Sequence, residues 1–110
     1  MATAEDFFAI DMRVGTVVEA QAFPEARNPS IKLAIDFGPE LGIKRSSAQL
    51  TVHYTPEVLI GRQIVAAVNL GSRRIAGFNS EVLVLGGMPM ATEVVLLALE
   101  RPVANGTRIG

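Results

Sequence analysis

Two adjacent arginines, Arg73 and Arg74, stand in the stretch NLGSRRIAGFNSEVLVLGG, which covers residues 69–87. Runs of aliphatic residues flank the pair, so it is expected on a short connection between two strands. The guanidinium group is planar and presents a fork of N–H donors that fits phosphate. Polar side chains that can hydrogen-bond phosphates or base edges lie nearby: Asn69, Asn79 and Ser80. The stretch predicts contact with nucleic acid; the alternative is a solvated turn.

The charges of the chain are unevenly distributed, although the net charge is only −1. Residues 1–40 carry seven acids and three bases, whereas residues 41–80 carry five bases and one acid. The arginine pair therefore belongs to a local basic block that the net charge conceals. We expect other members of the RNA-binding surface on the neighbouring strands: Lys32, Lys44, Arg45 and Ser46.

The kind of nucleic acid is suggested by the scarcity of aromatic residues. The chain has five Phe, one Tyr and no Trp. Proteins that bind single strands stack successive bases on aromatic side chains. The composition therefore favours recognition of the shape and backbone of a folded RNA.

A second group of residues indicates a different ligand. The segment GGMPMATE places Met88 and Met90 around a proline directly after an aliphatic run. Methionine side chains are flexible and polarizable, which suits surfaces that bind varied apolar partners. Together with Phe78 they predict a groove for an extended or unfolded peptide. The alternative is ordinary packing in a dimer interface.

Signatures of catalysis and of metal or cofactor binding fail. The chain has no cysteine, and His53 is its only histidine, so no zinc-type ligand set is expected. Ser46 and Ser47 lack the G-x-S-x-G context of a nucleophile. Gly86 and Gly87 lack the Lys-Ser/Thr of a phosphate loop. We expect a protein that is not an enzyme and needs no cofactor.

The elements that must position these residues are mostly strands. Length and composition (110 residues, 49% hydrophobic) predict one domain over residues 1–110. A helix begins at a capping pattern at Thr3–Asp6, and a single helical turn is expected at residues 55–60. Strands are expected at residues 12–23, 31–37, 43–48, 62–70, 81–87 and 94–100. Gly15 predicts a bulge or bend, and Asn105-Gly106 predicts a type I′ turn in a C-terminal hairpin.

This order predicts an all-β fold. Five strands with a helical insert after the third match the five-stranded OB-fold Greek-key barrel, here with short helices and a C-terminal β extension. A β-sandwich and an SH3-like barrel are the alternatives. No signal peptide and no membrane-spanning segment are recognised, which predicts a soluble cytoplasmic protein.

Motifs along nearly the whole chain resemble the tRNA-binding-domain family. These motifs are Asp11-x-Arg13-x-Gly15, Tyr54-x-Pro56-Glu57-x-Leu59-x-Gly61, and Asn69-Leu70 followed by Arg73-Arg74-Ile75-x-Gly77-x-x-Ser80-Glu81. Further stretches resemble the small stand-alone CsaA group within that family: FPEAR, SSAQ, RRIAGF, SEVLVLGG and the ending with NGT.

The resemblance implies an OB-fold homodimer that holds unfolded precursor polypeptides for export without catalysis. Binding of tRNA is the alternative function that it retains. It carries nucleic-acid contact to Lys44, Ser46, Asn69, Arg73, Arg74 and Ser80. The segment Phe7-Phe8-Ile10 and the C-terminal extension are the expected dimer contacts.

Overall fold

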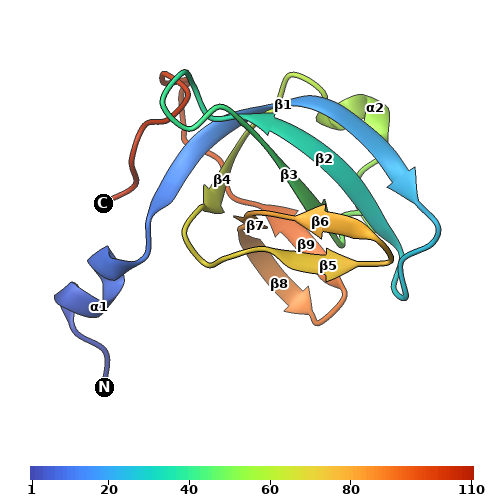
Figure 1. Ribbon diagram of the computed structural model, residues 1–110, viewed down its shortest axis with the longest axis horizontal. Coiled ribbons are helices and arrows are strands. Elements are labelled where there is room, and N and C mark those ends of the chain that lie inside the picture. The colour runs from blue at the N-terminus through green and yellow to red at the C-terminus, as the bar shows by residue number, and fades with distance from the viewer.

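A curved five-stranded antiparallel sheet with strand order β3-β2-β1-β4-β7 forms the body of the protein. The computed structural model describes residues 1–110. Two hairpins, β5–β6 and β8–β9, lie against this half-barrel (Figure 1). The elements are α1 (Ala4–Ala9), β1 (Met12–Phe23), β2 (Ser30–Asp36), β3 (Ile43–Ala48), α2 (Pro56–Leu59), β4 (Gln63–Ala67), β5 (Arg73–Ile75), β6 (Phe78–Ser80), β7 (Leu83–Val84), β8 (Gly86–Met90) and β9 (Glu93–Leu96). The predicted all-β OB-fold is confirmed.

The long strand β1 joins the two halves of the sheet. Its first part pairs with β4, and its second part pairs with β2. The expected irregularity is present, but the register shifts between Val17 and Glu19 rather than at Gly15. Gly15 serves close packing instead, because a Cβ there would stand 2.6 Å from Ile35 Cγ2 and 2.8 Å from the Phe37 ring.

The core is formed by the inward face of β2 and its neighbours. The strand predicted at residues 31–37 is confirmed as β2, and its Ile31, Leu33 and Ile35 are at most 2% exposed. Ala34, which alternation places on the other face, is only 7% exposed. It lies opposite Glu19 on β1 and Arg45 on β3, whose longer side chains flank it.

The open edge of β3 is closed by the segment that follows β6. Arg45 N–H donates to Glu81 Oε1 (3.0 Å), and Glu81 N–H donates to Arg45 O (2.8 Å). Ser47 N–H donates to Ser80 Oγ at 3.1 Å. These bonds satisfy backbone groups that a free strand edge would leave unpaired. They also hold the β5–β6 hairpin against β3.

The C-terminal part of the chain departs from the predicted pattern. The strand expected at residues 81–87 is divided between the two-residue β7 and the start of β8, and β8 pairs with β9. The predicted C-terminal hairpin is wrong. Thr107 N–H donates to Ala104 O, and only Gly106 of the two turn residues has positive φ, as in a type II turn.

The residues after this turn pair with β1 instead. Val14 N–H donates to Thr107 O, and Ile109 N–H donates to Met12 O, both at 2.9 Å. The turn with positive φ at both central residues, as type I′ requires, is Ala76-Gly77 between β5 and β6.

Both predicted helices form. Thr3 Oγ1 accepts from Asp6 N–H while the Asp6 carboxylate accepts from Thr3 N–H, which is the predicted capping box. Thr55 occupies the cap position of α2, but its side chain makes no capping hydrogen bond.

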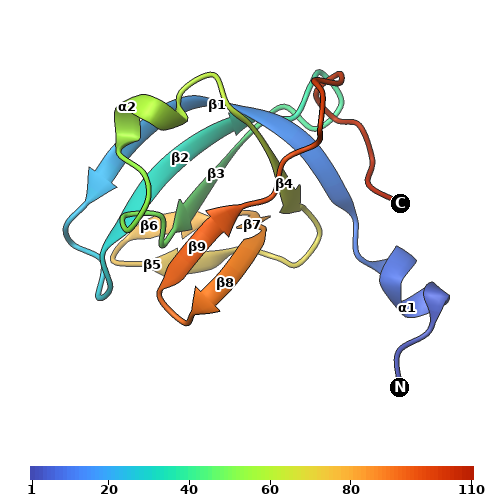
Figure 2. The same cartoon turned by 180° about the vertical axis from the view of Figure 1, so that it is seen from behind.

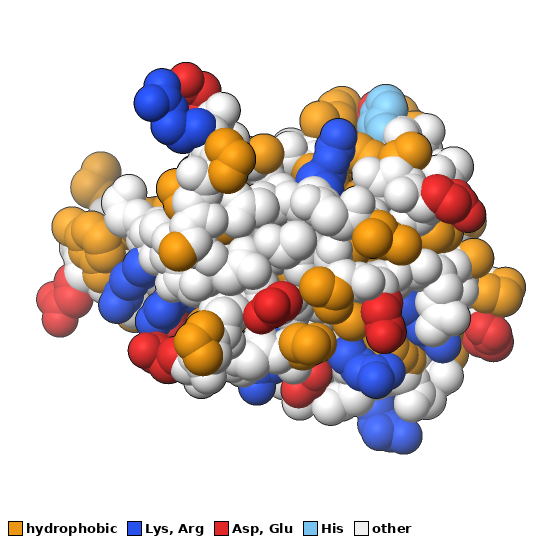
Figure 3. All heavy atoms as spheres, turned by 90° about the horizontal axis from the view of Figure 1, so that it is seen from above, with side chains coloured by type: hydrophobic (Ala, Val, Ile, Leu, Met, Phe, Trp, Pro, Cys, Tyr) orange, Lys and Arg blue, Asp and Glu red, His pale blue; other side chains and the backbone are white.

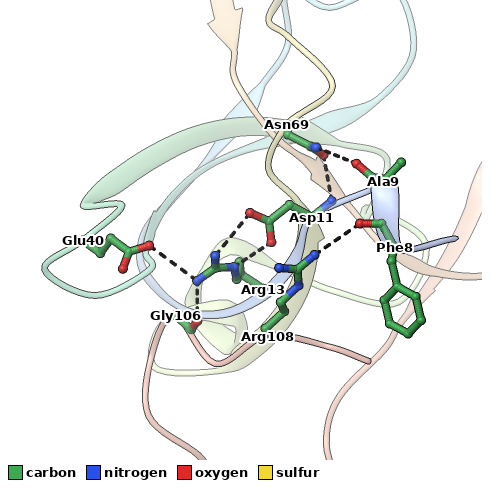
Figure 4. A network of polar contacts seen from close by, with 8 residues as sticks. All are labelled: Phe8, Ala9, Asp11, Arg13, Glu40, Asn69, Gly106 and Arg108. Atoms are coloured by element: carbon green, nitrogen blue, oxygen red, sulfur yellow. Dashed lines mark hydrogen bonds and ion pairs between the residues drawn. The ribbon is translucent and has the colours of Figure 1, made fainter. Parts of the chain in front are cut away.

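A polar network around Asp11 and Arg13 ties the N-terminal helix and the C-terminal segment to the sheet (Figure 4). Arg13 donates to both carboxylate oxygens of Asp11, at 2.6 and 3.3 Å, and to Gly106 O at 3.0 Å. Asn69 accepts from Asp11 N–H and donates to Ala9 O. Arg108 donates to Phe8 O. The network therefore joins segments from both ends of the chain.

We predict that the Asp11–Arg13 pair makes stability sensitive to acid. The hydrogen bonds from Arg13 hold the pKa of Asp11 below its ordinary value of 3.8. A carboxyl whose pKa is lower in the folded state stabilises the fold above its unfolded pKa, and this contribution disappears as the pH falls through the folded pKa. Denaturant unfolding at pH 7 and pH 3 should therefore show a smaller loss of stability for Asp11→Asn than for the unmodified protein. An equal loss in both would contradict this role.

Candidate functional site

A groove of about 380 Å³ lies on the outer face of β3, beside the loop that joins β1 to β2. One side is formed by that loop and by the end of β3, and β5 borders the groove as well. The other side comes from β7, β8 and β9; Figure 2 shows the β8–β9 hairpin beside the β5–β6 hairpin. The groove is lined by Ala26, Arg27, Asn28, Ser30, Ser47, Ala48, Gln49, Arg73, Ile75, Leu83, Val84, Gly86, Met88, Ala91 and Val94.

The two sides of the groove differ in chemistry. Arg27 and Arg73 are its charged residues, and no Asp or Glu is among the lining residues. The apolar part comes mainly from Ile75, Val84, Met88 and Val94. The groove therefore suits a ligand that carries negative charge beside an apolar group.

Most polar side chains of the groove have no partner within the chain. Ser30 Oγ donates to Asn28 O at 2.9 Å. The side chains of Asn28, Ser47 and Gln49 make no hydrogen bond within the protein, and Oε1 of Gln49 is buried without a partner. Buried polar groups are usually satisfied. The protein therefore leaves hydrogen-bonding capacity unused at these three side chains, and Oε1 of Gln49 must rotate to reach a ligand.

The two adjacent arginines point to opposite sides of the β5–β6 hairpin. Arg73 lies opposite Ser80 and Arg74 lies opposite Asn79 in the antiparallel register, so alternation separates them. Arg73 lines the groove, and Arg74 is exposed with Asn79 on the other side of the hairpin. Arg73 and Arg74 therefore do not form a single positively charged site.

Phe78 takes part in a different contact from the one expected for it. Its ring lies 5.5 Å from that of Phe23, and the Lys32 ammonium lies 4.5 Å from the Phe23 ring and 5.2 Å from the Phe78 ring. These contacts hold β6 over the outer face of β2. A smaller hollow of about 140 Å³ beside them is lined by Lys32, Arg45 and Phe78, among others.

The register of β2 and β3 divides the remaining basic residues. Lys32 and Arg45 share the outer face with the groove, since Lys32 lies opposite Ser47 and Arg45 lies opposite Ala34. Lys44 lies opposite the buried Ile35 and so does not share that face. The basic surface is therefore made by residues from β2, β3, β5 and the β1–β2 loop.

Three predicted RNA-binding residues have partners inside the protein. Ser46 is 1% exposed and donates to Val82 O at 3.0 Å. Ser80 is 8% exposed and accepts from Ser47 N–H. Asn69 uses both ends of its amide in the Asp11 network. The structure gives each of them a role in holding the fold.

Sequence reasoning missed the contribution of the β1–β2 loop and of Gln49. The stretch FPEARNPS has neither a strand pattern nor a helix pattern, although it places Arg27 and Asn28 at the groove. Gln49 follows Arg45 and Ser47 at every second position, and this period-two pattern could have placed it on the same face.

The two methionines occupy different positions. Met88 lines the groove, whereas Met90 lies at the tip of the β8–β9 hairpin, outside the lining, and is 67% exposed. His53 is an exposed residue whose Nε2 lies 2.6 Å from Glu93 Oε2. No group of three His, Cys, Asp or Glu side chains is placed to hold a metal ion.

The face that lies uppermost in Figure 1 offers no uniformly charged surface. Acidic and basic side chains are interspersed there, with apolar side chains between them (Figure 3). None of the helices is long and apolar enough to cross a bilayer.

Comparison with known proteins identifies relatives over almost the whole chain. The model of the family described as "Putative tRNA binding domain" matches residues 12–108. The methionine–tRNA ligase of Methanococcoides burtonii is 35% identical over 107 residues, which are 97% of this chain and 15% of the ligase. That of Thermotoga maritima is 31% identical, over 97% of this chain and 16% of the ligase. The chain thus spans about one seventh of these relatives.

Solved structures match over the full length. The chaperone CsaA of Bacillus anthracis is 59% identical, with a TM-score of 0.95 and coverage of 100% of this chain and 99% of that one. The CsaA chaperone protein of Picrophilus torridus is 43% identical, with a TM-score of 0.91 and full coverage of both chains.

Proposed function

The chain belongs to the tRNA-binding-domain family, and on that premise we propose that it binds folded RNA at the groove and the basic face around it. OB-folds bind oligonucleotides on the face of strands 2 and 3, between the loops that flank it. The groove lies at that place in this chain. The observation that carries the proposal is the pair Arg27 and Arg73, which come from different elements to a groove without acidic lining residues.

The remaining predicted residues extend this surface. Lys32 and Arg45 lie beside the groove on the same face, and Arg74 and Asn79 lie on the exposed side of the hairpin. A curved RNA backbone can contact several of these cations at once. The protein is proposed to act by binding alone, without catalysis, as a single domain over residues 1–110.

We expect RNA binding to weaken steeply with salt and to depend on Arg73. Each phosphate contact that is lost should lower the slope of log affinity against log salt by about 0.7–0.9. Arg73→Ala and Arg74→Ala should each reduce the affinity for unfractionated tRNA and flatten this slope. Arg101→Ala is the matched control, because Arg101 is exposed and pairs only with Glu100. Fluorescence anisotropy at several salt concentrations measures both quantities, and an unchanged slope in Arg73→Ala would refute the assignment.

A second candidate function is the holding of unfolded polypeptides. The apolar part of the groove around Met88 and Val94 favours it, as does the similarity to proteins named CsaA chaperones. In this function a precursor segment lies in the groove and is kept from aggregating, in the cytoplasm and before export. Ile75 and Val84 complete the apolar contact.

Polypeptide binding in the groove predicts different effects of mutating Met88 and Met90. Met88→Ser should reduce suppression of the aggregation of an unfolded precursor, since the change removes an apolar side chain from the groove. Met90→Ser should leave suppression unchanged, because Met90 lies outside the groove. Light scattering of a precursor diluted from denaturant measures both. Equal suppression of aggregation by the two variants would refute the assignment of polypeptide binding to the groove.

We also propose that the protein is a homodimer through α1 and the C-terminal segment. No residue of α1 is buried, and Phe7, Phe8 and Ile10 are 43%, 53% and 40% exposed. The helix projects from the body near the C-terminus (Figure 1). A second copy would remove these apolar side chains from water.

Light scattering after size exclusion tests the dimer. The expected mass is twice the 11.7 kDa of the chain, and Phe8→Asp combined with Ile10→Asp should give the monomer mass. A monomer mass for the unmodified protein would exclude the proposed dimer.

A further inference from the structure

We propose that the groove takes one unpaired nucleotide of a folded RNA, with its base against the apolar side and its phosphates on the arginines. The proposal rests on the RNA-binding function proposed above and adds a ligand class to it. Contact with a paired backbone alone would need only a basic surface. The groove has in addition an apolar side, and polar side chains that make no hydrogen bond within the protein.

The charged side suits the phosphates that flank such a nucleotide. Arg27 comes from the β1–β2 loop and Arg73 from β5, and neither forms an ion pair within the protein. Guanidinium groups bind phosphate through paired N–H donors and can also stack on a base. No Asp or Glu is among the lining residues, so no carboxylate faces a polyanion inside the groove.

The free polar side chains suit the edge of a base. Asn28 and Gln49 carry carboxamides, and Ser47 carries a hydroxyl, so donors and acceptors are both present. Oε1 of Gln49 is buried without a hydrogen bond, which is unfavourable in the free protein. Rotation of this side chain toward a donor on a base would give the oxygen a partner.

The apolar side suits the face of a base. Ile75, Met88 and Val94 offer an apolar contact without charge, and Met88 can adapt to the shape of the ring. The volume of about 380 Å³ is in the range of small-molecule pockets, and it cannot admit a double helix. Loops and bulges of folded RNA present unpaired bases of this kind.

A nucleotide accounts for more of the groove than an apolar peptide segment does. A peptide of hydrophobic residues would cover Met88 and Val94, and its backbone could hydrogen-bond Gln49, but it carries no negative charge for Arg27 and Arg73. A nucleotide meets all of them, because phosphate, base edge and base face lie within one unit.

The test compares two RNA duplexes that carry the same number of phosphates. One has a single bulged adenosine at its centre, and the other has an abasic residue at that place. We expect the unmodified protein to bind the bulged adenosine about tenfold more tightly, as one net hydrogen bond to the edge of the base provides. Asn28→Ala and Met88→Ala should each bring this ratio close to one by weakening the binding of the bulged adenosine. Arg74→Ala, outside the groove, should weaken both duplexes and keep the ratio.

The outcomes separate the two levels of the proposal. If neither duplex and no tRNA binds, both the RNA function and the nucleotide site are refuted. If both duplexes bind equally, RNA binding stands and the nucleotide site is refuted. If equal binding is accompanied by Met88-dependent binding of carboxymethylated α-lactalbumin, an unfolded polypeptide, the groove belongs to polypeptide and the inference is overturned. Asn28→Ala changes an exposed loop residue, so its effect does not depend on refolding of the core.

Discussion

The closure of the β3 edge by residues Ser80 to Val82 is the constraint on which the site depends. Four hydrogen bonds make it: two between Arg45 and Glu81, one from Ser47 N–H to Ser80 Oγ, and one from Ser46 Oγ to Val82 O. Because this segment begins at the last residue of β6, the closure holds the β5–β6 hairpin over the outer face of the sheet. Lys32, between the rings of Phe23 and Phe78, fixes the hairpin at a second place. The groove exists because these contacts place β5 beside the end of β3.

This arrangement brings the two candidate functions to one place. Arg73, the residue expected to bind phosphate, and Met88, expected to bind peptide, line the same groove. Arg74 and Met90, their neighbours in sequence, lie outside it. Strand alternation explains the first separation, and the register of β8 and β9 shifts between Gly87 and Met90 at the second. The residues that line the groove are therefore not grouped by proximity in the chain.

Sequence alone predicts the barrel well because its core follows a period of two. The apolar residues at every second position of residues 31–37 predict a strand with one buried face. All four are buried: Ile31, Leu33, Ile35 and Phe37. The C-terminal residues were misassigned because an Asn-Gly pair favours a tight hairpin, while contacts with β1 decide the conformation in this fold. The type I′ turn at Ala76-Gly77 was missed because Ala rarely adopts positive φ.

The sequence predicts only part of the candidate site, because residue types can be read from it but long-range contacts cannot. Arg73 and Met88 were recognised by residue type, but the partners of Ser46, Asn69 and Ser80 depend on long-range contacts that no local pattern shows. Arg27 and Asn28 reach the groove only through the fold of their loop.

Backbone-amide chemical shifts measured during titration with a folded tRNA test the central claim most directly. The account predicts that the largest changes fall on the groove, at Arg27, Asn28, Gln49, Arg73 and Met88, with smaller changes at Lys32 and Arg45. Changes confined to α1, the C-terminal segment or the uppermost face of the sheet, with the groove unaffected, would contradict it.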